Sequence, residues 1–411
     1  MRTGERVALV CVNTKECYSL IYQLWNDGKT VAFIDVFFPT ETIVELIKKV
    51  KCSEVIIPNS EITLKNELEA AGLDAEFYNE IRDATFQIQI SNINPDSKMI
   101  VFSSGTTSSS KAIVLSVESV VKSAKRLSDN IAVDIDGAAY IQAPLSHLWA
   151  ICSSMAFMFQ NRQIEFGSLI KEKKQLAELK PTVYLSTPSV IEKRFSKHTG
   201  IEHYICAGAV CAETLEKMVR DAGKTIQNCY GLSEVAGVCA ISAYDGPADK
   251  LFPVEKCSFD MCEDGTWICI DTLMEGYLGQ DELNKRVLRE DRVFISDIVR
   301  DNRDGTYSVL GRSDTVVALN NGIKIELESM DAQVKQIIEE CDACVLYKDG
   351  KLVLVIDRPV SDIQQLINKF NEGQPYYSRI FDYKITGCPF PRTELGKLKR
   401  NKLIEIVEGN C

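Results

Sequence analysis

Regular alternation of strand-like and helix-like segments is the feature that most limits the folds open to this chain. Val7–Val12, Thr30–Ile34 and Glu54–Ile57 are short apolar runs typical of buried strands, and Lys15–Asn26 and Glu41–Val50 between them have the periodicity of amphipathic helices. Such a series favours a parallel sheet, because each helix carries the chain back to the start of the next strand. The sequence therefore predicts an α/β fold.

The same alternation returns in the middle of the chain and ends at a polar segment. Strands are expected at Thr182–Leu185, Tyr204–Ala207 and Thr225–Cys229, and helices at Ser189–Phe195 and Ala212–Ala222. The last strand leads into Tyr230–Glu234. Ligands of open α/β sheets bind outside the carboxyl ends of the strands, so this segment is a predicted ligand site. The two alternating regions together predict wound, parallel-rich sheets.

The pattern changes in the last third of the chain. From Cys257 on, short strands alternate with Asp-Gly turns such as Asp304-Gly305. The 411 residues are too many for one hydrophobic core. A small α+β unit of about a hundred residues follows Gly311-Arg312, which is enough for a domain. We therefore predict a large N-terminal domain over residues 1–311 and a small C-terminal domain over residues 312–411.

Composition excludes several classes of protein. The formal net charge is −11, and no lysine and arginine cluster is long enough to form a nucleic-acid-binding face. The run Val7–Val12 is too short for a secretory signal, and Trp149–Phe159 contains two serines, so no membrane span is expected. The 15 cysteines are scattered singly through apolar runs, which is typical of reduced thiols and predicts a cytoplasmic protein.

A loop rich in small hydroxyl side chains stands between two further apolar runs. It reads Ser103-Ser104-Gly105-Thr106-Thr107-Ser108-Ser109-Ser110-Lys111. Backbone N–H groups, hydroxyls and a lysine on a tight turn can cradle a phosphate. The loop is not a Walker A motif, because that motif needs a second glycine before its lysine and Ser or Thr after it, whereas Ala112 follows Lys111. Taken alone, the loop is equally compatible with an ordinary turn.

Three further polar segments follow this loop in a fixed order. They are Tyr230-Gly231-Leu232-Ser233-Glu234, then Ser296-Asp297 with Gly311-Arg312-Ser313-Asp314, then Pro391-Arg392-Thr393-Glu394-Leu395-Gly396-Lys397. Each segment alone has an ordinary structural explanation, but those explanations do not account for the order of all four. From about residue 5 to its end, the chain resembles the adenylate-forming superfamily. That superfamily contains acyl- and aryl-CoA ligases, the adenylation domains of peptide synthetases and the luciferases.

The resemblance implies a large N-terminal domain that binds AMP and the acid, and a small C-terminal lid that moves about a hinge at Asp314. The segment Val317–Ile325 looks closer to the long-chain acyl-CoA ligase form than to the peptide-synthetase form. The region before the phosphate loop is short for the family, which leaves one wall of the acid pocket open to question.

The resemblance also implies contacts to the nucleotide. The loop corresponds to the phosphate loop, with Ser103, Ser104, Gly105, Thr106, Thr107 and Lys111 at the β- and γ-phosphates. Around the nucleoside, Asn228 and Tyr230 correspond to adenine contacts, Gly208 to the opposite wall, Asp297 to the ligand of both ribose hydroxyls and Arg312 to the arginine beside it. Gly231 belongs to the same segment as Tyr230, and Ser233 corresponds to the hydroxyl that touches the α-phosphate.

Three residues correspond to the chemical machinery. Glu234 matches the magnesium ligand, Lys397 the lysine that bridges the substrate carboxylate and the α-phosphate, and His147 the gate of the carboxylate pocket. A carboxylate that attacks a phosphate brings two anions together, and Lys397 with Mg²⁺ supplies positive charge at the bridging oxygens. Magnesium needs few protein oxygens beside the phosphates, so one glutamate suffices. The substrate carboxylate is itself the nucleophile, so no catalytic triad is required.

The phosphate loop departs from the family pattern. The Gly-x-Pro-Lys-Gly of the family corresponds here to Ser108-Ser109-Ser110-Lys111-Ala112, so two glycines and a proline are missing. We expect a less mobile loop and slower turnover.

The sequence thus predicts an AMP-forming acid–thiol ligase with ATP and Mg²⁺ as cofactors, which passes the acyl group to CoA or to phosphopantetheine. No carboxylate follows His147 until Glu165, so nothing there would pair an α-ammonium group, and an aryl or aliphatic acid is expected. The alternatives are an acyl-AMP ligase that loads a separate carrier protein, and a nucleotide-binding protein without turnover. A luciferase-type oxygenase is a further member of the family, but nothing in the sequence supports it.

Overall fold

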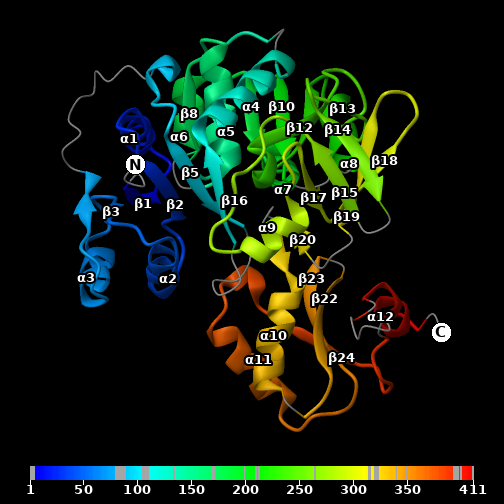
Figure 1. Cartoon of the computed structure of the whole chain (residues 1–411). Coiled ribbons are helices and arrows are strands. Elements are labelled where there is room, and N and C mark those ends of the chain that lie inside the picture. Colours follow the sequence, from blue (N-terminus) through cyan, green and yellow to red (C-terminus); the bar gives the residue numbers. More distant parts are fainter. Residues whose placement is uncertain are drawn as a thin grey trace. The chain divides into compact units, whose positions relative to one another are not determined.

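The computed structural model describes residues 5–78, 89–103, 111–132, 135–167, 172–198, 200–208, 211, 213–262, 265–312, 316–318, 324–338, 340–348, 350–391, 398 and 400–409. The chain forms two compact units that part between Ser313 and Asp314. Figure 1 shows the elements of both units in sequence colours.

The first sheet of the N-terminal unit has seven strands within the described residues, in the order β16-β6-β5-β2-β1-β3-β4. The strands are β1 (Arg6–Cys11), β2 (Thr30–Asp35), β3 (Glu54–Ile57), β4 (Glu76–Phe77), β5 (Lys98–Phe102), β6 (Ala112–Ser116) and β16 (Gly276–Tyr277). Neighbours from β4 to β5 run parallel, as the βαβαβ pattern predicts, whereas β6 and β16 are antiparallel additions.

Helices cover both faces of this sheet because its inner strand β1 is apolar on both sides. The helices are α1 (Lys15–Asn26), α2 (Thr40–Val50) and α3 (Ile62–Ala70). In β1, Leu9 belongs to the core cluster that contains α1, whereas Ala8 and Val10 belong to the cluster formed with α2 and α3. Successive side chains of a strand point to opposite faces, so one continuous apolar run fills two cores. Thr14 caps α1 by accepting the Cys17 N–H at 3.2 Å.

The second sheet has nine strands within the described residues, in the order β18-β19-β13-β12-β11-β10-β9-β7-β8. The strands are β7 (Ala139–Ile141), β8 (Ile164–Phe166), β9 (Val183–Ser186), β10 (His203–Ala207), β11 (Thr225–Leu232), β12 (Gly237–Ser242), β13 (Leu251–Pro253), β18 (Asp297–Asp301) and β19 (Tyr307–Arg312). Strands β8 to β11 are parallel, and the sheet continues antiparallel from β12. Helices α6 (Glu172–Leu179), α7 (Pro188–Arg194) and α8 (Glu213–Asp221) connect the parallel strands.

The predicted strands and helices of this region are confirmed, with one difference. Strand β11 continues to Leu232, so Tyr230 and Gly231 lie inside the strand and not after its end. The antiparallel partner β12 extends the pairing beyond the parallel part of the sheet, and a register shift between Tyr230 and Gly231 bends β11 at that point.

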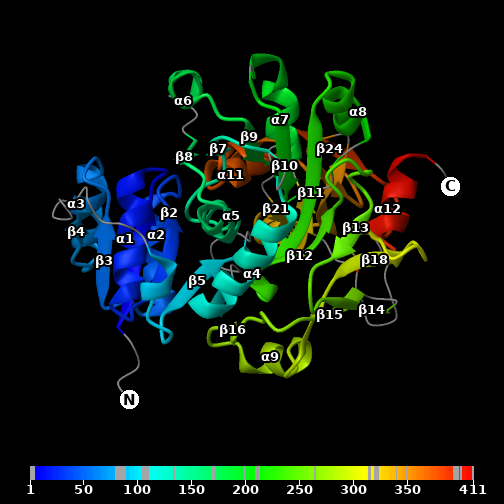
Figure 2. The same ribbon diagram turned by 90° about the horizontal axis from the view of Figure 1, so that it is seen from above.

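Two helices lie between the two sheets, α4 (Val117–Asn130), which keeps one exposed charged face, and α5 (Leu148–Phe159), which is largely buried. Figure 2 shows them between β5 of the first sheet and β12 of the second. One core cluster contains side chains of both helices and of both sheets, such as Leu9, Ile151 and Ile205. Helix α5 is apolar all around, as expected for a helix with protein on every side. No helix in the described part of the chain has the length and apolar character needed to cross a bilayer.

A small antiparallel sheet of β14 (Ser258–Cys262), β15 (Gly265–Cys269) and β17 (Arg292–Ile295) completes the N-terminal unit, together with α9 (Asp281–Val287). The predicted turn at Asp304-Gly305 joins β18 to β19, and the Asp304 carboxylate accepts the Thr306 N–H at 3.1 Å.

The C-terminal unit is a small α+β structure. It contains β20 (Val316–Ala318), β21 (Lys324–Glu326), α10 (Leu327–Ile337), β22 (Ala343–Lys348), β23 (Lys351–Ile356), α11 (Ile363–Glu372), β24 (Asp382–Ile385) and α12 (Arg400–Val407). Val345 and Leu354 face the cluster that contains α10 and α11, whereas Leu346 and Val355 face α12. The predicted fold class, a large α/β region with a smaller α+β region after it, is confirmed.

Ser123 of α4 offers a test of how this helix is joined to the second sheet. Its fully buried hydroxyl accepts the Val238 N–H at 2.9 Å, next to the bend in the β11–β12 pairing. Ser123→Ala leaves that N–H without an acceptor, which should lower the free energy of unfolding by about 1–3 kcal/mol. All three tryptophans lie in the N-terminal unit, so urea unfolding followed by tryptophan fluorescence reports on it.

Ser119→Ala on the same helix is the matched control, since the Ser119 hydroxyl bonds that of Ser116, the N-cap residue of α4, and not a residue of the second sheet. It should change the free energy by less than about 0.5 kcal/mol. Equal effects of the two substitutions would contradict the role given to Ser123.

Candidate functional site

The predicted site residues of the N-terminal unit follow the carboxyl ends of strands in both sheets. Ser103 follows β5, Gly208 follows β10, and Ser233 and Glu234 follow β11 in a short 3₁₀ turn over Ser233–Val235. Parallel neighbours end at the same edge of a sheet, so β10 and β11 present their polar ends together.

The two ends of the predicted phosphate loop are tied together. The Ser103 N–H donates to the Lys111 carbonyl at 2.9 Å, and the Lys111 N–H donates to Ser103 Oγ at 2.9 Å. These bonds extend the antiparallel β5–β6 pairing by one residue pair beyond Phe102 and Ala112. The loop residues Ser104, Gly105, Thr106 and Thr107 lie outside the described residues.

Lys111 and Glu234 both contact one tyrosine, Tyr277. The Lys111 ammonium lies 5.2 Å from the centre of the Tyr277 ring, and the Tyr277 hydroxyl donates to Glu234 Oε1 at 2.9 Å. The structure thus brings together the predicted phosphate-loop lysine and the predicted magnesium ligand, which are 123 residues apart (234 − 111). Tyr277 was not a predicted site residue. Its Gly-Tyr segment has no charge or spacing that distinguishes it from a core strand.

The predicted adenine and ribose contacts are also neighbours. The Tyr230 hydroxyl donates to Asp297 Oδ2 at 2.6 Å, although β11 and β18 are not neighbouring strands of the second sheet. Asp297 is only 5% exposed, so its side chain is largely shielded from water. Arg312 is the backbone partner of Asp297 in the antiparallel pairing of β18 with β19. The side chain of Arg312 lies outside the described residues.

Two glycines of the site are required by local geometry. A Cβ on Gly231 would stand 2.1 Å from the Gly237 carbonyl oxygen, so no other residue fits while β11 and β12 stay paired. Gly208 has a φ of +82°, a left-handed conformation that disfavours other residues. At both places the backbone itself, without a side chain, forms the surface next to the polar strand ends.

The amide of Asn228 is already oriented by the protein. Its Nδ2 donates to the Ala248 carbonyl at 2.9 Å, and its Oδ1 accepts from the Cys206 thiol at 3.7 Å. A hydrogen bond with Cys211, together with burial, raises the pKa of Cys206 well above its usual range, so that side chain remains a protonated donor. Oδ1 has two lone pairs, so a further donor such as an amino group can still bond it.

His147 stands at the N-cap position of α5 on an exposed loop, and its N–H donates to the Pro144 carbonyl at 2.9 Å. The other two histidines are buried elsewhere in the second sheet region, and burial lowers the pKa of His198 and of His203 to about 4. Both are therefore neutral at physiological pH, and His147 is the histidine positioned near the strand ends.

The first sheet holds the His147 loop through two side chains that the sequence analysis did not single out. Asn13 donates to the carbonyls of Ala143 and Gly167 at 3.0 and 2.9 Å and accepts the Leu145 N–H at 2.9 Å. Asp35 accepts the Ser146 hydroxyl at 2.7 Å. Asn13 follows β1 and Asp35 ends β2, so the carboxyl edges of the two sheets are joined here. The sequence signal that could have identified these two residues is a polar side chain at the end of a buried strand.

Lys397 and the predicted hinge residue Asp314 lie outside the described residues, so both remain predictions. The described residues also contain no group of three or more His, Cys, Asp or Glu side chains placed to hold a metal ion.

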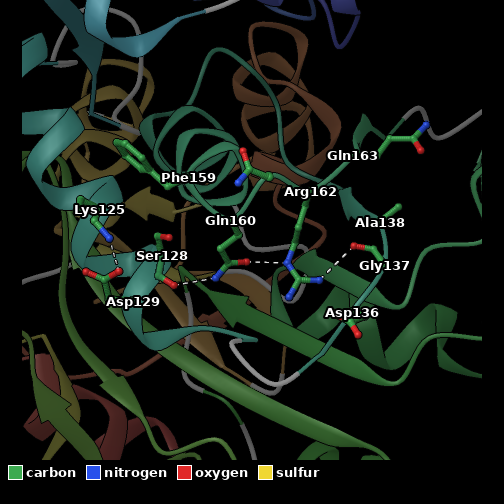
Figure 3. A pocket seen from close by; sticks show the side chains of 11 residues that line it. Lys125, Ser128, Asp129, Asp136, Gly137, Ala138, Phe159, Gln160, Arg162 and Gln163 are labelled. Carbon is green, nitrogen blue, oxygen red and sulfur yellow. Dashed lines mark hydrogen bonds and ion pairs between the residues drawn. The ribbon is translucent and has the colours of Figure 1, made fainter.

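A surface hollow of about 750 Å³ lies at the opposite edge of the second sheet (Figure 3). It is lined by residues that precede β7 and follow α5, such as Gly137 and Arg162. The Arg162 guanidinium donates to the carbonyls of Gly137 and Ala132 and to Gln160 Oε1, at 3.1, 2.6 and 2.6 Å. These bonds fix the chain before β7. The donors of Arg162 thus already have acceptors within the protein, so we do not regard the hollow as the functional site.

Comparison with known proteins agrees with the geometry. A family model described as AMP-binding enzyme matches residues 1–259. A D-alanine–D-alanyl carrier protein ligase of Listeria welshimeri is 24% identical over 448 residues, which span 93% of this chain and 85% of that protein. The long-chain-fatty-acid–CoA ligase 2 of Schizosaccharomyces pombe is 21% identical over 401 residues, 75% of this chain and 58% of that protein.

Solved structures share the fold. An o-succinylbenzoate CoA synthetase from Bacillus subtilis has a TM-score of 0.81 and 15% identity, covering 98% of this chain and 89% of that one. An amide bond synthetase from Marinactinospora thermotolerans has a TM-score of 0.79 and 14% identity, covering 98% and 90%.

Asn13→Ala tests whether the first sheet positions the His147 loop. The substitution removes three hydrogen bonds and leaves the buried Leu145 N–H without an acceptor, so the free energy of unfolding should fall by about 1–3 kcal/mol. Urea unfolding followed by tryptophan fluorescence measures the change. Asn66→Ala, on the exposed face of α3, is the control and should be neutral or slightly stabilising. A neutral Asn13→Ala would show that the loop does not depend on this clamp.

Proposed function

Because the chain belongs to the AMP-binding enzyme family, we propose that it is an ATP-dependent ligase that activates a carboxylic acid as an acyl adenylate and passes the acyl group to a thiol. The observation that carries the proposal is the Tyr230–Asp297 hydrogen bond at 2.6 Å. It joins the side chains assigned to adenine and ribose across 67 residues of sequence, next to the turn that holds Ser233 and Glu234.

The nucleoside would bind over β11. An aromatic ring such as that of Tyr230 offers a face for the purine, and Gly208 leaves room for the other side of the base. The Asp297 carboxylate has about four lone-pair directions, so it can accept ribose hydroxyls in addition to the Tyr230 hydroxyl. Asn228 Oδ1 would accept an adenine amino group, and Ser233 would touch the α-phosphate. The backbone of Arg312 pairs with that of Asp297 across β18 and β19.

The phosphates and Mg²⁺ would bind between β5, β6 and the turn after β11. Glu234 is a hard oxygen ligand of the kind magnesium prefers, and one hydrogen bond from Tyr277 leaves its carboxylate able to coordinate. When bound, the ion would neutralise charge on the phosphate oxygens. Lys111 and the hydroxyls of the loop from Ser103 to Thr107 would hold the β- and γ-phosphates.

Charge compensation is the chemical task of the remaining residues. The acid carboxylate attacks the α-phosphate and pyrophosphate leaves. Lys397 would place its ammonium between the two anions and stabilise the charge that develops on the bridging oxygens. His147 would close the carboxylate pocket at the start of α5. The lid over residues 312–411 would then turn about Asp314 and admit the thiol to the acyl carbonyl.

The acceptor thiol is either CoA or the phosphopantetheine of a separate carrier protein. The relatives include both a carrier protein ligase and a CoA ligase. A reducing compartment such as the cytoplasm agrees with the cysteines, since all 14 described ones are free thiols.

The acid is proposed to be aryl or aliphatic. The residues after His147 are Leu148, Trp149 and Ala150, which are apolar and buried or half-buried. The first turn of α5 therefore offers no carboxylate to pair an α-ammonium group. The similarity to a D-alanine–D-alanyl carrier protein ligase favours an amino acid as the second candidate.

An ATP–pyrophosphate exchange screen decides between these acids. Wild-type protein is tested with aryl acids, aliphatic acids, D-alanine and L-amino acids. We expect exchange with simple acids and at least about tenfold less with amino acids, because an unpaired buried ammonium costs several kcal/mol. Exchange with amino acids alone would reject the acid class. If AMP stabilises the protein but no acid supports exchange, the chain binds nucleotide without turnover.

Lys397 should serve only the first half-reaction. Lys397→Ala is expected to slow adenylation on the order of a hundredfold or more, because its charge acts while the carboxylate attacks the phosphate. Supplied with synthetic acyl adenylate, the variant should form thioester at the wild-type rate. Lys384→Ala, at an exposed lysine of the same unit, is the control and should leave both rates unchanged. Equal losses in both half-reactions would contradict this division of roles.

A further inference from the structure

Tyr277 contacts two oppositely charged groups of the proposed site. Its ring is only 6% exposed and lies 5.2 Å from the Lys111 ammonium, while its hydroxyl donates to Glu234 Oε1 at 2.9 Å. One side chain therefore contacts a cation through its π face and an anion through its hydroxyl. A phenol is suited to both contacts, because the ring face attracts cations and the hydroxyl is a donor.

The backbone of Tyr277 is fixed from two directions. On one side, β16 pairs with β6, where the N–H groups of Glu275 and Leu278 donate to Val114 and Ala112 at 2.8 Å. On the other side, the Asn284 amide of α9 accepts the Tyr277 N–H at 2.8 Å and donates to its carbonyl at 2.9 Å.

Gly276 makes this clamp possible. It has a φ of +141°, and a Cβ at this position would come within 2.9 Å of Asn284 Nδ2. The Met274 N–H, two residues before β16, donates to the Glu234 carbonyl at 2.9 Å, so the segment that leads into β16 approaches the turn that carries Glu234. The clamp holds the tyrosine in place before any ligand arrives, as required of a group that orients others.

The arrangement keeps two opposite charges apart. Lys111 and Glu234 contact the same side chain, yet they form no ion pair with each other in the described structure. A direct pair would neutralise both groups and direct them away from the ligand. With the tyrosine in contact with both, the ammonium remains available to phosphate and the carboxylate to a cation.

We propose that Tyr277 is a positioning residue that separates and aims Lys111 and Glu234, so that one site presents an ammonium to the terminal phosphates and a carboxylate to their metal ion. The inference rests on the proposed function and deepens it. It makes the two contacts of Tyr277 separable: the hydroxyl serves the metal ligand, and the ring serves the lysine.

Two substitutions separate these contacts. Tyr277→Phe keeps the ring beside Lys111 and removes the bond to Glu234, so the Mg²⁺ concentration for half-maximal effect should rise about three- to tenfold, the value of one hydrogen bond. Tyr277→Leu removes both contacts and permits a direct Lys111–Glu234 pair, so MgATP should bind about tenfold more weakly or worse. AMP lacks the terminal phosphates, and its affinity should stay within about twofold in both variants.

The measurement is thermal stabilisation of the full chain by three probes, MgATP, ATP with EDTA, and AMP, each titrated to saturation. ATP–pyrophosphate exchange at varied Mg²⁺ gives a second readout. Tyr140→Phe, in β7 of the second sheet, is the matched control. It likewise removes a tyrosine hydroxyl with a hydrogen bond, which donates to Gln175 Oε1 at 2.9 Å. It should lower stability as Tyr277→Phe does and leave the Mg²⁺ dependence unchanged.

Each outcome has one meaning. Weaker MgATP binding with preserved AMP binding supports the proposal. Wild-type MgATP and Mg²⁺ dependence in both variants overturns it and leaves the proposed function intact, and so does an equal loss of AMP and MgATP affinity, which would indicate a purely structural tyrosine. If the wild-type protein itself is not stabilised by MgATP, the proposed function fails and the inference fails with it.

Discussion

The packing of α4 and α5 between the two sheets is the constraint on which the N-terminal unit depends. Helix α5 is almost entirely apolar and largely buried, so it cannot lie on a surface, and it packs against α4 and against strands β7, β8 and β12 of the second sheet. Both sheets therefore direct one apolar face of their strands toward the same layer, as Leu9 of β1 and Ile205 of β10 do. Their outer faces are covered by the connecting helices, which explains why the strands are apolar throughout.

This layered core also determines where polar groups gather. Parallel strands end at one edge, and side chains just beyond that edge need not pack in a core. Asn13 and Asp35 use this position to bond the loop before α5, so the helix that separates the sheets begins at a point held by the first sheet. The Tyr230–Asp297 pair arises similarly, where antiparallel strands extend the second sheet beyond its parallel part.

The sequence predicted what periodicity can reveal and missed what depends on contacts between distant segments. The strands near Val7 and Tyr204 and the helices between them follow from patterns of apolar residues. The extension of β11 to Leu232 does not, because it depends on pairing with β12. The position of Tyr277 beside Lys111 depends on β16 joining β6, where Tyr277 pairs with Ile113 from 164 residues away (277 − 113). Resemblance to a family gave the order of the site segments, but not these supporting contacts.

The altered phosphate loop can be understood from its fixed end. Where the family has glycine after the lysine, this chain has Ala112, which is the first residue of β6, fully buried, paired with Phe102 and bonded through its carbonyl to Leu278. A methyl group there fills the core cluster that contains Phe102 and Leu278. The lysine is then positioned by a strand and by the Tyr277 ring instead of by a glycine-rich turn. The absence of the family's glycines from the loop is therefore compatible with an ordered Lys111, since β6 and Tyr277, which contact it, lie in the sheet.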